Sequence, residues 1–180
     1  MTLIRKATIK DAKKIRNLSL SRCISIESNE RSGLINYVPP SLKKYSNRIL
    51  MGNFYIAEDK GNLIGFIDSF DYRTLNEVFK KNEITSKILS LEENPFIYSN
   101  TLVLSKDYEG AWISSKLLKN LINNIGKQYF SLWGAIVHSP KRNQTSIKFS
   151  ERAGFELQEE ITTSFKLTFG IYRKMLNPIK

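Results

Sequence analysis

The stretch from Asn143 to Phe155 reads Asn-Gln-Thr-Ser-Ile-Lys-Phe-Ser-Glu-Arg-Ala-Gly-Phe, and it carries the signals of one short helix. Asn143 is a favourable N-cap, because its side-chain oxygen can accept a hydrogen bond from a backbone N–H of the first turn. Gly154 can adopt the left-handed conformation in which many helices end, and Phe155 is then placed for the apolar contact that accompanies such an end. We therefore expect a helix between Asn143 and Gly154, followed by two closing strands between Phe155 and Leu176.

The segments before this helix alternate between strand and helix. Tyr129 to Val137 is an apolar run rich in β-formers, about half as long as a membrane span, and it predicts a buried central strand. Residues 96–104 predict another strand, which the polar Ser99-Asn100-Thr101 interrupts. Between the two strands, a helix is predicted to begin after Gly110 and to end near Gly126. Its apolar positions recur every three or four residues, at Leu117, Leu118, Leu121, Ile122 and Ile125.

The first half of the chain predicts a strand at residues 3–7, a helix from Thr8, and a second helix that Ser41 caps after Pro39-Pro40. A hairpin then joins apolar runs at 54–57 and 63–67, and residues 72–93 form a helical insert. The resulting order is β-α-α-β-β-insert-β-α-β-α-β-β. It predicts an α/β (α+β) fold, with a mixed sheet flanked by helices and parallel crossovers in its second half.

Composition excludes several classes of site and partner. The 180 residues suit a single domain, residues 1–180, that can bury a core without disulfides or metals. Cys23 and His138 are the only cysteine and histidine, which excludes an internal disulfide and a cysteine-rich or multi-histidine metal centre. No signal-like apolar run is present, so we expect a cytoplasmic protein with no membrane partner. The 28 Lys and Arg residues against 17 Asp and Glu give a net charge of +11, which suggests an anionic partner.

The order of elements resembles that of the GNAT superfamily of N-acetyltransferases, and two segments carry the likeness. They are Leu102 to Gly110, which leads into a helix, and Asn143 to Phe155. The resemblance extends over about residues 2–176. It implies a mixed, mostly antiparallel β-sheet of about seven strands flanked by helices, with the insert at about residues 72–93 between the third and fourth strands.

The resemblance implies acetyl-CoA as co-substrate and no metal. The backbone from Leu102 to Leu104 would bind the pantetheine arm and polarise the thioester carbonyl. The loop and helix start from Glu109 to Ser115 would present backbone N–H groups to the pyrophosphate, which the positive end of a helix also attracts. The residues expected to bind the co-substrate are Leu102, Val103, Leu104, Glu109, Gly110, Ala111, Trp112, Ile113, Ser114, Ser115 and Asn143.

The phosphate loop departs from the pattern of the family. Glu109, Trp112 and Ser114 stand where the family has Gln or Arg, then Gly, then Gly or Ala. A carboxylate about 6 Å from a phosphate would be repelled by roughly 3 kcal/mol at an effective dielectric constant of about 20. The indole of Trp112 could also crowd the phosphates. Four basic residues can offset the glutamate: Lys106, Lys116, Lys141 and Arg142.

Amine acetylation also needs a group that removes a proton from the attacking amine, because an ordinary pKa of about 10.4 keeps that amine charged at neutral pH. Many family members hold a carboxylate near the position of Tyr98, but this chain has no Asp or Glu from Pro95 to Lys106. The base is then a water held by Tyr98, Ser99 or Asn100, or a neighbouring carboxylate. The carboxylates in question are Glu58, Asp68 and Asp71.

Ser150 occupies the position at which the family often has a general-acid tyrosine. Serine is a poor acid, but a thiol of pKa about 8.5 leaves as thiolate at pH 7 with a disadvantage of only about 2 kcal/mol. We therefore name Tyr98, Asn100 and Ser150 as the candidate catalytic residues. A lone histidine such as His138 more often has a packing role than a catalytic one.

These observations favour an acetyl-CoA-dependent N-acetyltransferase, in which a neutral primary amine attacks the thioester directly. The joint departures at Glu109, Trp112, Ser114 and Ser150 keep open a second interpretation, a non-catalytic GNAT-like module that binds a ligand or partner. A nucleic-acid-binding domain would rest on net charge alone, and it is disfavoured. The acceptor is left open between a small-molecule amine and a protein amine, as is a homodimer. Glutamates of the insert could make the acceptor cleft acidic: Glu77, Glu83, Glu92 and Glu93.

Overall fold

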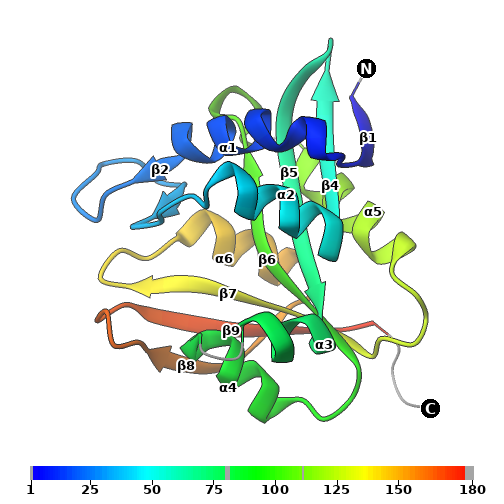
Figure 1. The fold of residues 1–180 in the computed structure, drawn as a ribbon. Helices are drawn as coiled ribbons and strands as arrows, with labels where there is room; N and C mark the ends of the chain where they lie inside the picture. Colours follow the sequence, from blue (N-terminus) through cyan, green and yellow to red (C-terminus); the bar gives the residue numbers. More distant parts are fainter. Residues whose placement is uncertain (1, 80–81, 111, 177–180) are drawn as a thin grey trace.

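The computed structural model describes residues 2–79, 82–110 and 112–176, and within them a seven-stranded sheet forms the centre of the molecule (Figure 1). The strand order is β1-β4-β5-β6-β7-β9-β8. Strands β6 and β7 run parallel, and the other described neighbours run antiparallel. The predicted mixed, mostly antiparallel sheet is therefore confirmed. Its strands are β1 (Leu3–Lys6), β4 (Asn53–Asp59), β5 (Asn62–Asp71), β6 (Phe96–Leu104), β7 (Ser131–Ser139), β8 (Glu156–Thr162) and β9 (Thr168–Met175).

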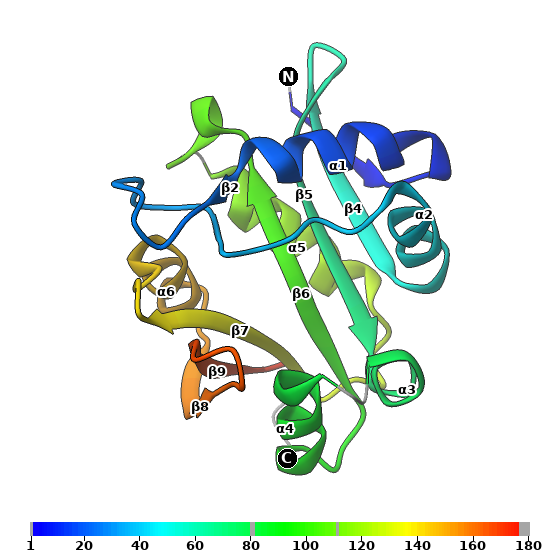
Figure 2. The ribbon, with the colours of Figure 1, turned by 60° about the vertical axis from the view of Figure 1, so that its left-hand side comes forward.

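Helices cover both faces of this sheet (Figure 2). Because side chains of a strand alternate between faces, Phe66 of β5 packs under α1 and α2, whereas Ile67 packs under α5 and α6. The longest described helix, α5, has 12 residues and rises about 18 Å, so no described helix can cross a membrane. The helices are α1 (Ala12–Ser21), α2 (Leu42–Met51), α3 (Tyr72–Thr74), α4 (Glu83–Leu91), α5 (Ile113–Asn124) and α6 (Gln144–Arg152), with short 3-10 or π turns at Ile9–Asp11, Leu75–Phe79 and Lys106–Tyr108.

The helical insert lies where the sequence predicts it, between β5 and β6, which are the third and fourth strands of the sheet along the chain. The Asp71 carboxylate begins it by accepting a hydrogen bond of 2.8 Å from the Thr74 N–H. Leu75 and Ile88 of the insert are fully buried against Phe96 and neighbouring aromatic residues of the sheet. The insert therefore covers the end of the sheet from which β6 starts.

The pairing of β6 with β7 is short, and this shapes the whole molecule. It extends only from Phe96 to Ser99 on β6, opposite Ser131 to Gly134 on β7. Beyond that point β6 continues beside β5 and β7 continues beside β9, so the two parallel strands diverge (Figure 2). A β-bulge marks the point of divergence, since Asp68 pairs with Thr101 and the next residue of β5 pairs with Ser99, which leaves Asn100 as the extra residue.

Helix α6 ends as the sequence predicts, in a Schellman motif. Gly154 has φ +81°, and its N–H donates to the Glu151 carbonyl at 3.0 Å. The N–H of Phe155 donates to the Ser150 carbonyl at 2.9 Å, and the Phe155 ring is buried in the core under α5 and α6. The motif turns the chain sharply into β8, so α6 stays over the diverging part of β7.

The segment between α1 and α2 contains a feature that the sequence did not predict. Two short strands, β2 (Cys23–Ile24) and β3 (Leu34–Ile35), pair in parallel apart from the main sheet. We call residues 25–33, which join them, the strap. The strap bonds to both sides of the divergence: Lys106, after β6, contacts the Glu30 carboxylate at 2.6 Å, and Asn143, after β7, donates to the Gly33 carbonyl at 3.2 Å.

Replacing Gly154 with alanine should lower the free energy of unfolding by about 1–2 kcal/mol, because an L-residue is strained in the left-handed region. The new Cβ would also approach Lys174 Nζ at 3.0 Å, although the end of a lysine side chain can move. Gly134→Ala is the matched control, since its Cβ would meet only the Ser99 carbonyl at 3.9 Å. Urea unfolding of both variants measures the difference, and equal losses would contradict the role given to Gly154.

Candidate functional site

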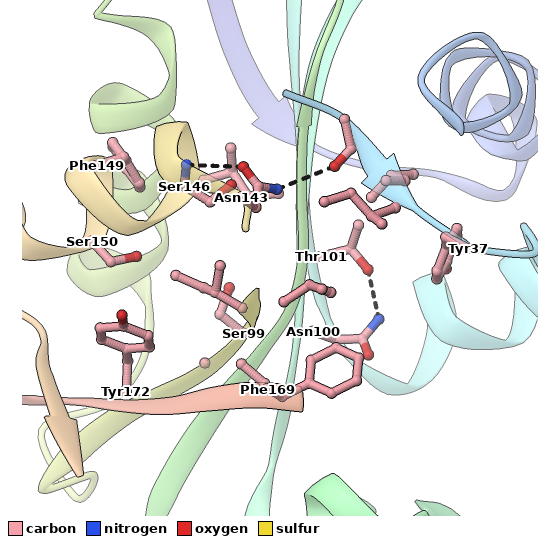
Figure 3. Close-up of a pocket in the computed structure, with 18 of the residues that line it drawn as sticks. Tyr37, Ser99, Asn100, Thr101, Asn143, Ser146, Phe149, Ser150, Phe169 and Tyr172 are labelled. Atoms are coloured by element: carbon pink, nitrogen blue, oxygen red, sulfur yellow. Dashed lines mark hydrogen bonds between the residues drawn. The ribbon is translucent and has the colours of Figure 1, made fainter. Parts of the chain in front are cut away.

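A cavity of about 290 Å³ lies in the opening between β6 and β7 (Figure 3). Its walls come from β3, the bulge of β6, the free edge of β7, helix α6 and strand β9. Side chains of both faces of the sheet meet here because the two strands have parted. The residues labelled in Figure 3 are Tyr37, Ser99, Asn100, Thr101, Asn143, Ser146, Phe149, Ser150, Phe169 and Tyr172.

A second, smaller pocket of about 110 Å³ extends this cavity toward the start of α5. The two share Gly33, Leu34, Leu102, Ser146 and Phe149 in their walls, so together they form one groove along the divergence. The wall of the smaller pocket also includes six of the residues predicted to bind a co-substrate: Leu102, Val103, Leu104, Glu109, Gly110 and Ser114.

Backbone groups of β6 point into this groove. The N–H of Ser105 donates to the Ile64 carbonyl of β5 at 2.8 Å. Because successive residues of a strand point their backbone groups to opposite sides, Leu104 and Leu102 direct theirs toward the opening instead. The edge that β7 has left is therefore a row of donors and acceptors that an extended ligand can pair with.

The start of α5 has the properties that attract an anion. Its N-cap residue, Trp112, makes no side-chain cap, so the first N–H groups and the positive helix end face outward beside the smaller pocket. The Trp112 side chain is 55% exposed, and Lys116 Nζ lies 3.1 Å from its ring centroid, so the indole lies against the lysine and does not line the smaller pocket. Ile113 is buried in the core, Ser115 is exposed, and Ala111 falls outside the described residues.

The Glu109 carboxylate, which sequence analysis expected to repel an anion, has a buried counter-ion. Arg22 Nη2 donates to it, and Ser32 Oγ of the strap donates to it at 2.5 Å. Arg22 is only 5% exposed, and it also donates to the Ser32 carbonyl at 3.2 Å. The site therefore carries a positive charge next to the glutamate that the sequence left unassigned.

The lysines that were expected to offset Glu109 have other partners. Lys106 pairs with Glu30, Lys116 lies over Trp112, and Lys141 donates to the Ser28 carbonyl. Their role in meeting the charge of the co-substrate stays a prediction. Arg22 lies 87 positions before Glu109 at the end of α1, so no local sequence pattern links the two.

The candidate catalytic residues divide between the cavity wall and the core. Asn100 lines the cavity, and its amide donates to Asp68 Oδ2 at 3.0 Å and to Thr101 Oγ1 at 2.9 Å. Tyr98 is buried against Trp133 in the core below the insert and does not line the cavity. Burial raises the pKa of Tyr98, so its phenol stays protonated at neutral pH.

Asp68 is the carboxylate that lies directly behind the cavity. It is 1% exposed, and Arg48 Nη1 of α2 lies 3.5 Å from its Oδ2. Burial raises the pKa of Asp68, and the charge of Arg48 opposes that rise. Arg48 also donates to the hydroxyl of Tyr37, a cavity residue, at 3.5 Å. On the side of α1 and α2, polar contacts thus connect Tyr37, Arg48, Asp68 and Asn100 in one network.

The other carboxylates considered from the sequence have structural partners. Glu58 pairs with Arg5 at 2.8 Å, and Asp71 caps α3. Glu92 of the insert is buried against Ser131 and Arg173. The Glu83 carboxylate accepts a hydrogen bond from the Ser164 N–H. Neither Glu83 nor Glu92 lines the cavity, and the acidic cleft made by the insert stays a prediction.

Several solved structures with this arrangement are N-acetyltransferases, and others are described as acetyltransferases of the GNAT family. The ribosomal-protein-S18-alanine N-acetyltransferase from Escherichia coli has a TM-score of 0.67 at 15% identity, over 100% of this chain and 97% of that chain. An N-acetyltransferase from Staphylococcus aureus has a TM-score of 0.67 at 18% identity, over 98% and 99%. A chain of the NatC complex bound to Gag peptide and CoA has a TM-score of 0.67 at 14% identity, over 98% and 99%. This chain has the GNAT fold.

The GNAT fold confirms the resemblance inferred from residues 102–110 and 143–155. Comparison of sequences alone does not reach it, because no protein-family model and no curated protein matches the chain. At identities of 12–18% the likeness establishes the GNAT fold, and the chemistry has to be argued from the site itself. Three site features went unnoticed in the sequence: Arg22, the strap and Tyr172.

Proposed function

We propose that this protein is an acetyl-CoA-dependent N-acetyltransferase, in which a neutral primary amine attacks the thioester directly. The supporting observation is the groove between the diverged β6 and β7, which runs from the Asn100 bulge to the start of α5. Along that direction it combines a polar cavity, a free strand edge and a site suited to an anion. The similar E. coli and S. aureus structures are N-acetyltransferases, and the NatC complex was solved with CoA bound.

In this proposal the groove binds acetyl-CoA along its length. The backbone of Leu102 to Leu104 pairs with the pantetheine arm, and Asn143 at the start of α6 approaches the arm from the opposite wall. The N–H groups from Ile113 to Ser115 receive the pyrophosphate at the positive end of α5. A strand N–H near the bulge would polarise the thioester carbonyl, as donors of an oxyanion hole do.

Arg22 neutralises the negative charge of Glu109, which would otherwise oppose binding of the pyrophosphate. A lone carboxylate about 6 Å from a phosphate would weaken binding by roughly 3 kcal/mol, or about a hundredfold. The guanidinium of Arg22 cancels that charge locally, and Ser32 ties both groups to the strap. With Glu109 neutralised and Trp112 turned away, two of the departures that favoured a non-catalytic module no longer do so.

The acceptor amine enters the cavity between Tyr37 and Phe169 and loses its proton toward Asp68. The carboxylate lies behind Asn100, which donates to it and lines the cavity, so one water at the bulge completes the path. Burial raises the pKa of Asp68, which makes its carboxylate a better proton acceptor than an exposed one, and the charge of Arg48 opposes that rise. The acceptor class extends from small amines to peptide amines, since the NatC neighbour was solved with a peptide.

The primary test is binding of acetyl-CoA by calorimetry, followed by thiol release with a panel of small amines and peptide N-termini. We expect binding with a Kd below about 1 mM, the upper end of ordinary enzyme affinities, and thiol release that depends on an amine. Binding without thiol release for any amine would support the non-catalytic module instead. No binding at millimolar acetyl-CoA would exclude the proposed function.

Arg22→Met should weaken acetyl-CoA binding by about tenfold or more, because it leaves the Glu109 charge uncancelled near the pyrophosphate. In a Glu109→Gln background the same change should have a much smaller effect, since no carboxylate is left to neutralise. Calorimetric Kd values for the two single variants and the double variant measure this coupling. Lys13→Met, an exposed residue of α1, is the control, and additive losses would contradict the charge cancellation.

Asp68→Asn should lower kcat by about a hundredfold with little change in the KM for acetyl-CoA, as expected when a general base is lost. In the wild type, activity should fall as the pH drops through the pKa of Asp68, which burial raises above the ordinary value. Below that pKa the carboxyl group already holds a proton and cannot accept another. Asp71→Asn, on the same strand but outside the cavity, is the control. A pH profile unchanged in Asp68→Asn would exclude Asp68 as the base.

A further inference from the structure

Tyr172 places a phenol in the part of the cavity that α6 covers. Its side chain belongs to β9, is 3% exposed and lines the cavity. Figure 3 shows its hydroxyl pointing toward Ser150 of α6. This face of the sheet, with α5 and α6, is the one on which the groove would hold acetyl-CoA, whereas Tyr37 and Asn100 lie on the side of the acceptor.

The Tyr172 hydroxyl is the inner end of a hydrogen-bonded chain that leads to the surface. It lies 2.9 Å from His138 Nε2, and His138 Nδ1 bonds to the carboxylate of Glu160 on β8. An ionised carboxylate only accepts, so Nδ1 carries the proton of the imidazole, and Nε2 accepts a hydrogen bond from the phenol. The Glu160 side chain is 52% exposed, so the far end of the chain is in contact with solvent.

The backbone makes room for this chain of groups. A Cβ atom at position 170 of β9 would lie 2.4 Å from His138 Cε1 and 2.9 Å from Tyr172 Cε2, so only glycine fits there. His138 is 8% exposed and meets the Tyr172 ring edge-on, at 5.7 Å between centroids. Glycine at position 170 therefore leaves the space in which the imidazole lies beside the phenol.

We propose that Tyr172 is the general acid of the reaction, a proposal that rests on the proposed acetyltransferase function. As the amine nitrogen forms its bond to the thioester carbon, the C–S bond breaks and its electron pair goes to sulfur. The Tyr172 hydroxyl, which otherwise donates to His138 Nε2, gives its proton to that sulfur. After the products leave, the phenolate takes up a proton from water, which replaces the proton that the amine lost toward Asp68, so the cycle balances.

The charges around Tyr172 agree with this role. Burial, followed by the negative charge of Glu151 on α6, raises the pKa of Tyr172; Glu160 adds to the rise, and Arg142 before α6 opposes it. The phenol therefore holds its proton at neutral pH, as a general acid must. His138 and Glu160 act as positioning residues, because they reach the substrate only through the phenol. Ser150, the earlier candidate for this role, has a small side chain, which leaves room for the Tyr172 phenol beside it.

The test is Tyr172→Phe, which removes one oxygen and keeps the ring. At pH 7 we expect kcat to fall about 30-fold with an unchanged KM for acetyl-CoA. Without a general acid the leaving group departs as thiolate, and for a thiol of pKa about 8.5 this is disfavoured by about 1.5 pKa units at pH 7. The deficit should shrink as the pH is raised toward 8.5, where thiolate needs no proton. Tyr72→Phe, a tyrosine of α3 outside the cavity, is the matched control.

His138→Asn provides a second readout, with a smaller loss of kcat and no change in acetyl-CoA affinity measured by calorimetry. Equal kcat for wild type and Tyr172→Phe at pH 7, or a deficit independent of pH, would overturn the assignment. Absence of thiol release in the wild type would instead overturn the proposed function. The two failures are therefore distinguishable in one series of assays.

Discussion

The early end of the β6–β7 pairing is the constraint on which the rest of this structure depends. Four residue pairs hold the parallel strands together, and then the bulge at Asn100 lets them part. A continuous sheet would have satisfied the β6 edge internally and left no groove. The divergence exposes that edge, brings residues of both sheet faces into one cavity, and places the start of α5 at one end of it. Every proposed step of the reaction uses one of these three results.

Much of the fold could be predicted because its signals are local. The capping of α6 by Asn143 and Gly154, the hairpin of β4 and β5, and the apolar spacing of α5 each lie within a few residues of sequence. The bulge is also visible in the sequence, because polar residues 99–101 interrupt the apolar run of β6. The strap and its two short strands are not, since their bonds reach residues more than 70 positions away.

The candidate site was harder to predict than the fold for the same reason. Arg22 looked like one more basic residue of a helix end, and its pairing with Glu109 arises only when the chain folds. Tyr98 was chosen by position along β6, but alternation along the strand turns its side chain into the core below the insert. Tyr172 lies on the last strand, where the sequence offers no motif, and it meets the cavity because β9 is the neighbour of β7.

The strap also joins parts of the molecule that the sheet alone would leave independent. It starts from α1, bonds to the loop after β6 through Lys106 and Glu109, and bonds to the α6 side through Asn143 and Thr145. These hydrogen bonds therefore connect the two walls of the groove where β6 and β7 are farthest from pairing. The layer formed by α1 and α2 is consequently in mechanical contact with both walls of the groove. Substitutions in that layer, far from any reacting atom, can thus alter how widely the two walls stand apart.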